Sequence, residues 1–420
     1  MTSKHFTLTA LRSGLNLVSK QQIRRLSLHE YQSQSLLKEF GVPVPRGKLA
    51  QSPKEVASIV EELGRRCVIK SQILKGGRGK GSFDSGLQGG IHSVDTPQAG
   101  EAIAGRMIGS RLRTKQTPET GITVNKLYVA EAVEYDQEWY LAMTIDRENY
   151  APTIIISKNG GVDIEMTARE HPEELHAFRF SITKGITQEV ADEISSRLGL
   201  SPTETESLRS VLDGMYDVFT SRDATLLEVN PLVRSAEGGF TCLDAKFTFD
   251  NAAEKRQRDL FALRDAENEV PEEVEAEKYG LVYVRTDGNI GNVVNGAGLA
   301  MATNDAIAYH GGASANFLDA GGQATKETMQ KAFEIILRDD RVRAVLVNIY
   351  GGIIRCDMIA ESIIGAAQEL GPLRVPVVVR LQGTNSELGL KLLEDADLGL
   401  HTEHDFGEAA KKAVELANAG

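Results

Sequence analysis

The segment from residue 281 onward carries the pattern that most restricts the fold of this chain. Short apolar runs alternate there with stretches of helical periodicity. The runs occupy residues 281–284, 314–318, 343–349 and 375–381, and the helical stretches 297–309, 326–338, 357–370, 387–395 and 405–418. Such alternation predicts a parallel sheet with helices on both faces. The runs 346–349 and 377–379 are close to continuous, as expected of strands that are buried on both sides.

The part of the chain before residue 263 follows a different pattern. Two helices are expected within residues 28–65, separated by a break at 41–45. Strand signals follow at 67–70, 127–133, 139–145, 153–157, 226–229 and 240–246, and helical stretches at 96–109, 187–198 and 204–220. This mixture of hairpins and helices predicts an α+β region.

An acidic segment, residues 263–278, separates the two patterns. It contains Pro271 and few large apolar residues, which is typical of a linker or a solvated connection. A chain of 420 residues is long enough for two or three domains. We therefore expect one domain at 27–262, a linker at 263–278 and a second domain at 279–420.

The charge of the chain is unevenly distributed. Residues 1–25 hold five Lys and Arg but no Asp or Glu, so the rest of the chain has a net charge of −17, against −12 for the whole. An acid-free basic leader is typical of a mitochondrial presequence, which we assign to residues 1–26, with a basic tail as the alternative. The acidic remainder argues against general nucleic-acid binding. No apolar run approaches the roughly 18 residues that span a bilayer.

The three cysteines, Cys67, Cys242 and Cys356, lie far apart in the sequence. Their spacing fits neither a zinc site nor a disulfide framework. We expect buried, inert thiols in a reducing compartment such as the mitochondrial matrix.

A basic, glycine-rich loop, Lys75–Gly81, follows the strand that ends at Lys70. Its glycines allow backbone N–H groups to approach phosphate oxygens, and its Lys and Arg side chains neutralise charge. The loop matches neither GxxxxGK[ST] nor GxGxxG, the two common nucleotide fingerprints. We predict an anion site here, to which Lys70 adds a cation, with a solvated basic turn as the alternative.

A predicted hairpin brings oxygen ligands together. The strand ending at Asn230 and the strand containing Asp244 are joined by a turn at 235–239, so the two residues are expected to lie close together. Both supply the hard oxygen ligands that Mg²⁺ takes alongside nucleotide phosphates. Glu228 is two residues before Asn230 and so shares its face of the strand. Each residue alone also fits an ordinary hairpin end.

Two further acids flank a predicted pair of strands. Glu131 and Glu138 are candidates for accepting hydrogen bonds from ribose hydroxyls, with a solvated face as the alternative. None of the eight histidines has an obvious carboxylate or serine partner in the sequence. The chain therefore offers no evident catalytic histidine of its own.

Glycine-bearing loops follow the four apolar runs of the second region. They begin at Asp287, Asp319, Tyr350 and Gln382, and a further glycine-rich stretch begins at Asn295. In parallel α/β sheets, ligands bind beyond the carboxyl ends of the strands. We therefore predict a binding edge, for which helix N-termini behind the loops favour an anion. Ordinary tight turns are the alternative.

These motifs together resemble the β subunits of succinate–CoA ligase. The stretches that carry the resemblance, in chain order, are Leu28-His29-Glu30-Tyr31, Gly76–Gly81, Glu228-Val229-Asn230-Pro231, Leu243-Asp244, Asp287–Gly291, Val294–Met301, Ala315–Asp319 and Val347–Gly352. The resemblance extends from about residue 27 to the end of the chain. It implies an N-terminal ATP-grasp fold followed by a flavodoxin-like ligase domain.

The resemblance also implies an activity and a partner. The family interconverts succinyl-CoA, phosphate and NDP with succinate, CoA and NTP, in the mitochondrial form within the matrix. The phosphoryl group travels on a histidine of the α subunit, which also binds most of the CoA. An αβ heterodimer or a heterotetramer is implied.

Site residues are carried over motif by motif. The residues implied to hold nucleotide phosphates are Lys70, Gly77, Arg78 and Gly79, and those near base and ribose are Glu131 and Glu138. Asn230 and Asp244 would bind Mg²⁺, and Glu228 would orient the partner's histidine. The residues implied to face the succinate and phosphohistidine site are Asn295, Gly352, Ile353 and Ile354.

Nucleotide choice depends on one position. GTP-forming relatives tend to carry Gln where this chain has Pro45, and proline offers no side-chain donor or acceptor to guanine. We therefore predict an ATP/ADP enzyme, with GTP/GDP as the alternative. Three residues depart from the family pattern, namely Gln323 in place of a glycine, Asn292 in place of a common Cys and Tyr350 in place of a common Phe.

Two other functions fit parts of the sequence. A malate–CoA ligase β chain would share these motifs but act on a different dicarboxylate. A subunit that senses nucleotide without turnover would need only the nucleotide site. The presence of Glu228 together with Asn230 and Asp244 favours the catalytic reading.

Overall fold

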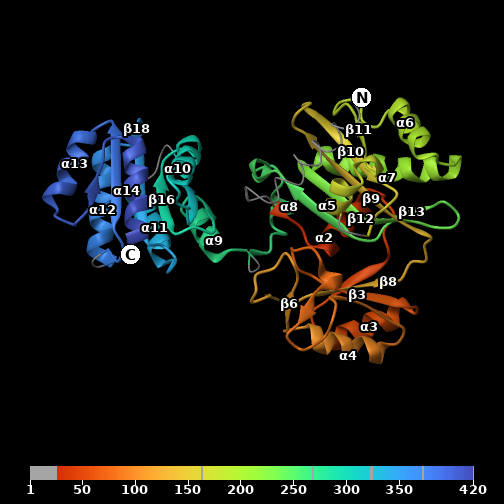
Figure 1. Cartoon of the computed structure of the whole chain (residues 1–420). Helices are drawn as coiled ribbons and strands as arrows, with labels where there is room; N and C mark the ends of the chain where they lie inside the picture. The colour runs from red at the N-terminus through yellow and green to blue at the C-terminus, as the bar shows by residue number, and fades with distance from the viewer. Residues whose placement is uncertain (1–25, 162–163, 267–268, 322–324, 371–372, 420) are drawn as a thin grey trace. The chain divides into compact units, whose positions relative to one another are not determined.

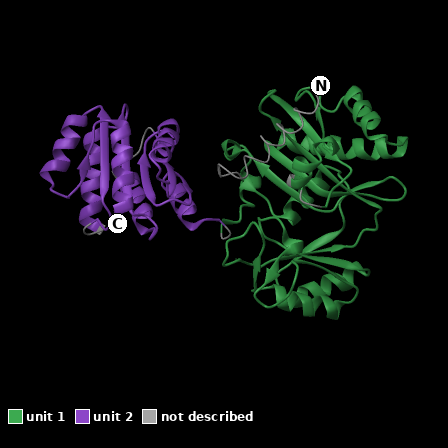
Figure 2. Ribbon diagram, viewed as in Figure 1, with its two compact units in different colours: residues 1–268 green, residues 269–420 purple. Residues whose placement is uncertain are grey.

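The computed structural model describes residues 26–161, 164–266, 269–321, 325–370 and 373–419. The chain divides into two compact units, unit 1 up to residue 268 and unit 2 from residue 269 (Figure 2). Each unit has hydrophobic cores of its own. Among the described residues, no helix is long and apolar enough to cross a membrane.

The largest sheet of unit 1 is antiparallel (Figure 1). Its strands, in spatial order, are β1 (Leu26–Ser27), β14 (Ala245–Phe249), β12 (Ala224–Arg234), β9 (Gln137–Asp146), β10 (Ala151–Ser157) and β11 (His176–Arg179), with β13 (Phe240–Cys242) paired to β12. Side chains alternate between its faces, as strand geometry requires. Trp139, Leu141 and Met143 enter the main core, whereas Tyr140 and Ala142 belong to a smaller core on the other side.

Helices cover both faces of this sheet. The main core is shared with α2 (Glu30–Glu39), α6 (Gln188–Leu198) and α7 (Pro202–Ser221), and the smaller core with α5 (Ile164–Glu170). Helix α7 begins with a capping box, in which Ser201 and Glu204 each bond the other's backbone N–H. A short helix, α8 (Arg258–Phe261), ends the unit.

Two smaller sheets complete unit 1. One contains β2 (Gly47–Ala50), β8 (Leu127–Glu131), β3 (Cys67–Ser71) and β5 (Ile91–Val94), and the other β4 (Ser82–Phe83), β6 (Arg111–Arg113) and β7 (Ile122–Thr123). Helices α3 (Pro53–Leu63) and α4 (Pro97–Met107) pack on the first through a common core. The basic loop lies between β3 and β4, where Arg78–Lys80 form a single turn of 3-10 helix.

Unit 2 contains a four-stranded parallel sheet of β16 (Ile290–Val294), β18 (Ala344–Gly351), β19 (Val377–Gly383) and β20 (His401–Thr402). Helices α11 (Lys326–Arg338), α12 (Cys356–Leu370) and α13 (Ser386–Asp395) share a core with one face. Helices α10 (Ala297–Tyr309) and α14 (Phe406–Ala419) share a core with the other. The predicted parallel sheet with helices on both faces is therefore confirmed.

The strand order of unit 2 corrects one part of the sequence interpretation. β15 (Val282–Arg285) and β17 (Asn316–Asp319) form a separate antiparallel pair. The parallel sheet starts instead at β16, for which the sequence pattern predicted no strand. The Asp287 loop therefore precedes β16 and lies at the edge formed by the amino ends of the parallel strands, not at the predicted binding edge. Gly288 N there donates to Ser314 O. The loop that joins the binding edge in its place is the one at Asn295, directly after β16.

The predicted acidic linker is also partly wrong. Residues Pro271–Lys278 form helix α9, whose Ala276 is fully buried in the core of unit 2. The helix has few apolar residues, and one of its acids, Glu273, is buried and accepts from Arg285 N at 3.1 Å. The composition of the segment therefore resembled that of a linker. At the other end of the chain, the proposed presequence lies outside the described residues except for Leu26. Leu26 is buried in strand β1, where it pairs with Phe249 of β14.

Candidate nucleotide and substrate sites

A buried cluster of charges lies at the centre of unit 1. The Glu30 carboxylate, whose side chain is 2 % exposed, accepts from Lys70 Nζ at 2.6 Å and from Arg78 at 2.8 Å. Lys70 also donates to the backbone carbonyl of Leu243 at 2.6 Å. Burial alone would raise the pKa of Glu30, but Lys70 and Arg78 outweigh it and hold the pKa below its usual value. Glu30 thus remains ionised and fixes both cations.

Arg78 connects the basic loop to the hairpin. Its second guanidinium nitrogen donates to Asp244 Oδ2 at 2.6 Å. Burial disfavours the charged guanidinium, yet Asp244 and Glu30 raise the pKa of Arg78 above its usual value. Burial raises the pKa of Asp244, and Arg78 opposes that rise. The four groups form a chain in which Lys70 and Arg78 alternate with the two carboxylates.

The loop backbone holds Arg78 in place. Gly77 adopts the left-handed region, with φ of 77°, immediately before the 3-10 turn. Gly90 N donates to Arg78 O at 2.8 Å, and Arg78 itself donates to Ser71 O at 2.8 Å. Gly79 has room for a close backbone approach, since a Cβ there would meet only Ile91 at 3.9 Å. The solvated-turn alternative is therefore wrong for Arg78, which is 8 % exposed.

The predicted hairpin is confirmed, and it brings the two candidate metal ligands together. β12 pairs with β13 through the turn at 235–239, and Asn230 N donates to Asp244 O at 3.1 Å. The Asn230 side-chain oxygen accepts from Gly161 N at 2.7 Å, so it lies at the edge where the β10 strand ends. The Asp244 side chain is 27 % exposed. The two candidate metal ligands are thus neighbours through their backbones, and the Asp244 carboxylate is partly open to solvent.

This pair of oxygens fits a Mg²⁺ ion bound together with a nucleotide. Mg²⁺ is usually held by one or two protein oxygens, with phosphates and waters completing its shell. Among the described residues, no group of three or more His, Cys, Asp or Glu could enclose a metal by itself. Asn230 and Asp244 would therefore hold the ion only together with phosphate oxygens of the nucleotide. The ion would in turn neutralise the negative charge of those phosphates.

Glu228 lies on the same face of β12 as Asn230, as predicted. It is paired across the sheet with Ala142 on β9 and Lys246 on β14. The Tyr140 hydroxyl bonds its carboxylate, and burial together with this contact raises the pKa of Tyr140 well above its usual value. Tyr140 therefore stays protonated and orients Glu228.

The two acids proposed for base and ribose have different surroundings. Glu131 accepts from the Arg46 backbone N–H and side chain at 3.0 Å, beside Pro45. Burial would raise the pKa of Glu131, but Arg46 lowers it. Glu138 instead accepts from the Tyr135 hydroxyl at 2.6 Å. A Cβ on Gly161 would lie 1.7 Å from Glu138, so this acid is next to the loop that contacts Asn230.

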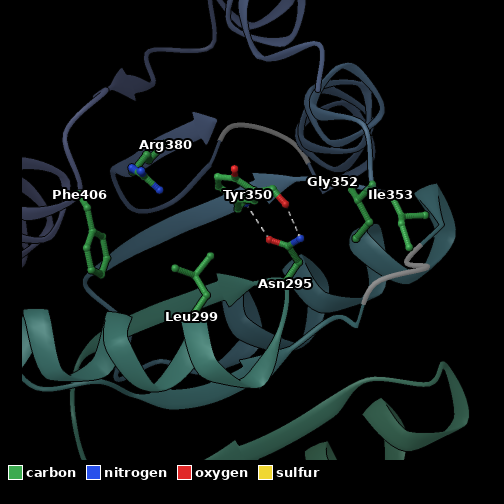
Figure 3. Close-up of a pocket in the computed structure, with 8 residues that line it drawn as sticks. Asn295, Leu299, Tyr350, Gly352, Ile353, Arg380 and Phe406 are labelled. Carbon is green, nitrogen blue, oxygen red and sulfur yellow. Dashed lines mark hydrogen bonds between the residues drawn. The ribbon is translucent and has the colours of Figure 1, made fainter. Parts of the chain in front are cut away.

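A pocket of ≈ 450 Å³ lies at the carboxyl edge of the sheet in unit 2 (Figure 3). All four residues predicted to face substrate line this pocket, namely Asn295, Gly352, Ile353 and Ile354. The other lining residues are Tyr350 and three that the sequence did not indicate, namely Leu299, Arg380 and Phe406. The Asn295 amide donates to Tyr350 O and accepts from Tyr350 N, both at 2.8 Å. These two hydrogen bonds join the loop after β16 to the end of β18.

Two of the three departures from the family pattern lie within the described residues. Asn292 is buried on β16, where its backbone and side chain bond Asn316. Tyr350 is 56 % exposed, and its backbone O and N bond the Asn295 side chain. Gln323 lies outside the described residues.

Sequence reasoning assigned no role to Glu30, Tyr140 or Arg380. Glu30 stood within a quoted motif, but its partners Lys70 and Arg78 are 40 and 48 residues away. No local spacing signals such a contact. Arg380 interrupts the apolar run of β19, which is the one hint in the sequence that a cation lies near the carboxyl edge of this sheet.

Comparison with known proteins identifies the family and the domain order of the chain. Residues 27–234 match the family described as ATP-grasp domain, and residues 293–414 the family described as CoA-ligase. The mitochondrial succinate–CoA ligase [ADP-forming] subunit beta of Neurospora crassa is 43% identical over 97% of this chain and 91% of its own length. The mitochondrial succinate–CoA ligase [GDP-forming] subunit beta of Dictyostelium discoideum is 42% identical over 94% of each chain.

A solved structure supports the fold independently of close sequence similarity. The ATP citrate lyase of Methanothrix soehngenii, determined with citrate and coenzyme A, superposes with a TM-score of 0.65 at 17% identity, covering 94% of this chain and 100% of that one. The predicted order, an ATP-grasp fold followed by a CoA-ligase domain, is confirmed.

Proposed function

Since this chain belongs to the succinate–CoA ligase β-subunit family, we propose that it is the nucleotide-binding β subunit of an ADP-forming enzyme of the tricarboxylic acid cycle. The reaction interconverts succinyl-CoA, phosphate and ADP with succinate, CoA and ATP. A histidine of an α subunit carries the phosphoryl group, and that subunit binds most of the CoA. We place the αβ heterodimer, or a tetramer of two such pairs, in the mitochondrial matrix.

The convergence of Lys70, Arg78 and Asp244 within unit 1 is the observation that carries this proposal. Lys70 and Arg78, with the Gly77 and Gly79 backbone, hold the nucleotide phosphates. Asn230 and Asp244 hold Mg²⁺, which spreads the charge of the transferring group when it is bound. We assign these steps to a domain at residues 27–262.

The remaining roles follow the positions of the side chains. Glu228, held by Tyr140, orients the partner's histidine as it receives phosphate. Glu131 and Glu138 contact base and ribose. The ligase domain, residues 279–420, presents Asn295 and the Gly352–Ile354 loop to succinate and phosphohistidine.

The choice of ADP rests on Pro45. Relatives named as ADP-forming and as GDP-forming have nearly the same overall identity to this chain, so identity does not discriminate between them. Pro45 is buried next to Arg46, which binds Glu131. A proline there gives guanine no side-chain partner.

The test is phosphorylation of the α subunit. The chain from residue 26, which keeps strand β1 intact, should give acid-labile labelling of the α histidine by ATP but not by GTP when it is reconstituted with its α partner and Mg²⁺. Asn230→Ala should abolish labelling, whereas Asn149→Ala, at an exposed turn, should not. Turnover should be faster with succinate than with malate.

Each other result has a defined meaning. Labelling by GTP alone would contradict the Pro45 assignment but keep the ligase. Faster turnover with malate than with succinate would show that malate is the substrate of the enzyme. Nucleotide binding without any labelling would leave only a sensing subunit.

A further inference from the structure

The guanidinium of Arg380 is a buried charge without a carboxylate partner. The residue lies on β19 and is 8 % exposed. It donates to Asn348 Oδ1 at 2.9 Å, to the His404 carbonyl at 3.2 Å and to Gln382 Oε1. All three acceptors are neutral. Within the described part of the chain, no Asp or Glu lies at ion-pair distance from it.

Such an arrangement is costly unless an anion completes it. Burying an ion costs several kcal/mol, and neutral hydrogen-bond acceptors offset only part of that cost. The contrast with unit 1 is direct, because the equally buried Arg78 has two carboxylates. Three of the five N–H groups of Arg380 are used internally, which leaves two for a ligand.

The charge faces a pocket of suitable size. Arg380 is part of the lining of the ≈ 450 Å³ pocket, and the Phe406 ring centroid lies 5.6 Å from its Cζ atom. Leu299 supplies a second apolar wall. In Figure 3, Arg380 and Phe406 lie toward one end and Ile353 toward the other. The Ile353 side chain is 82 % exposed, so that end is the open rim.

We propose that Arg380 binds the non-reacting carboxylate of the dicarboxylate substrate. This inference rests on the proposed function and deepens it by naming the specificity residue. The reacting carboxylate must reach phosphohistidine and CoA on the partner, so it belongs at the open rim beside the Gly352–Ile354 loop. The second carboxylate of the same four-carbon chain then points inward to the guanidinium. Leu299 and Phe406 contact the methylene groups between them.

Two substrates and two variants test the assignment. In the reconstituted αβ enzyme, Arg380→Gln should raise KM for succinate roughly 10- to 100-fold, the range expected for loss of a hydrogen-bonded charge. Activity with butyrate, which lacks the second carboxylate, should be unchanged, so the preference for succinate over butyrate should collapse. Arg380→Lys should restore part of it. Arg374→Gln is the matched control, because Arg374 precedes the same strand and binds backbone carbonyls away from the pocket.

The experiment distinguishes a merely structural role of Arg380 from a failure of the proposed function. If Arg380→Gln lowers activity with both acids equally, or keeps the wild-type KM for succinate, the proposal is wrong. Labelling of the α histidine by ATP should survive in the Arg380 variants, since it needs only unit 1 and the partner. Absence of labelling in the unmodified enzyme would instead refute the proposed function itself.

Discussion

Glu30 is the residue on which the proposed nucleotide site depends, although we do not expect it to touch nucleotide. It holds Lys70 and Arg78 at 2.6 and 2.8 Å in a buried setting. Without it, two cations would lie close together with only Asp244 opposing them. Their positions for phosphate binding are therefore set before any ligand arrives, which reduces the entropic cost of binding.

Glu30→Gln should destabilise unit 1 by about 3–5 kcal/mol, because it leaves buried charge uncompensated. The single tryptophan, Trp139, is buried in the main core of unit 1 and reports its unfolding by fluorescence. Urea titration of the full chain gives the free energy of unfolding. Glu39→Gln is the control, since Glu39 is 59 % exposed and pairs with Arg222 at the surface. That change should cost about 0–1 kcal/mol. Equal effects of the two variants would refute the role of Glu30.

The residues of the site were predictable to the extent that their chemistry is local. The glycine-rich basic loop and the hairpin predicted that Lys70, Arg78 and Asp244 gather and that Asn230 adjoins Asp244, as the contacts show. Their roles in ligand binding stay predictions. Glu30 was missed because a buried ion pair between distant segments leaves no periodic signal in the sequence.

At the scale of single elements, β16 shows why a strand escaped prediction. Its Gly291 and Asn292 are residues that disfavour strands. The fold needs both: a Cβ on Gly291 would lie 2.4 Å from Ile336, and Asn292 bonds Asn316 on β17. Tertiary contacts thus override local preference. Helices α10 to α14 were predicted within about one residue, since their apolar periodicity is strong.

The start of α2 should make unit 1 sensitive to mild acid. His29 is 1 % exposed, and its Nε2 lies 2.7 Å from Asp265. Burial lowers the pKa of His29 from 6.5, although Asp265 opposes the change. The unfolded chain therefore takes up the proton first, and stability falls as pH decreases below about 6.5.

We expect urea titrations followed by Trp139 fluorescence to show this loss between about pH 7 and pH 5.5. His29→Gln should flatten the dependence, whereas His171→Gln, at a site 59 % exposed, should not. An unchanged slope in His29→Gln would show that other groups cause the pH dependence.

At the scale of the whole molecule, the two units have separate cores and are expected to unfold separately. Gly389 offers a way to test this. It lies in α13, where Ala would add about 1 kcal/mol of helix propensity. However, a Cβ there would be 2.7 Å from the backbone carbonyl oxygen of Cys356, and overpacking of this kind costs about 1–3 kcal/mol.

Gly389→Ala should therefore destabilise unit 2 while leaving the Trp139 transition of unit 1 in place. Hydrogen exchange of α12 and α13 measures the first effect and fluorescence the second. Gly298→Ala, where a Cβ meets nothing within 4 Å, is the control within the same unit. A parallel shift of the Trp139 transition would mean that the units unfold as one.

The contact between Arg78 and Asp244 has a consequence for how ligands are taken up. Lys70, Arg78, Glu30 and Asp244 carry no net charge together, so the protein alone is electrostatically balanced. If Arg78 and Asp244 have the roles proposed above, phosphate that draws Arg78 away from Asp244 would free this carboxylate for a cation, and a cation on Asp244 would free Arg78 for phosphate. Linkage then requires that nucleotide and Mg²⁺ strengthen each other's binding by the same factor. In Asp244→Asn that mutual enhancement should shrink, even if Arg78 still binds the nucleotide alone.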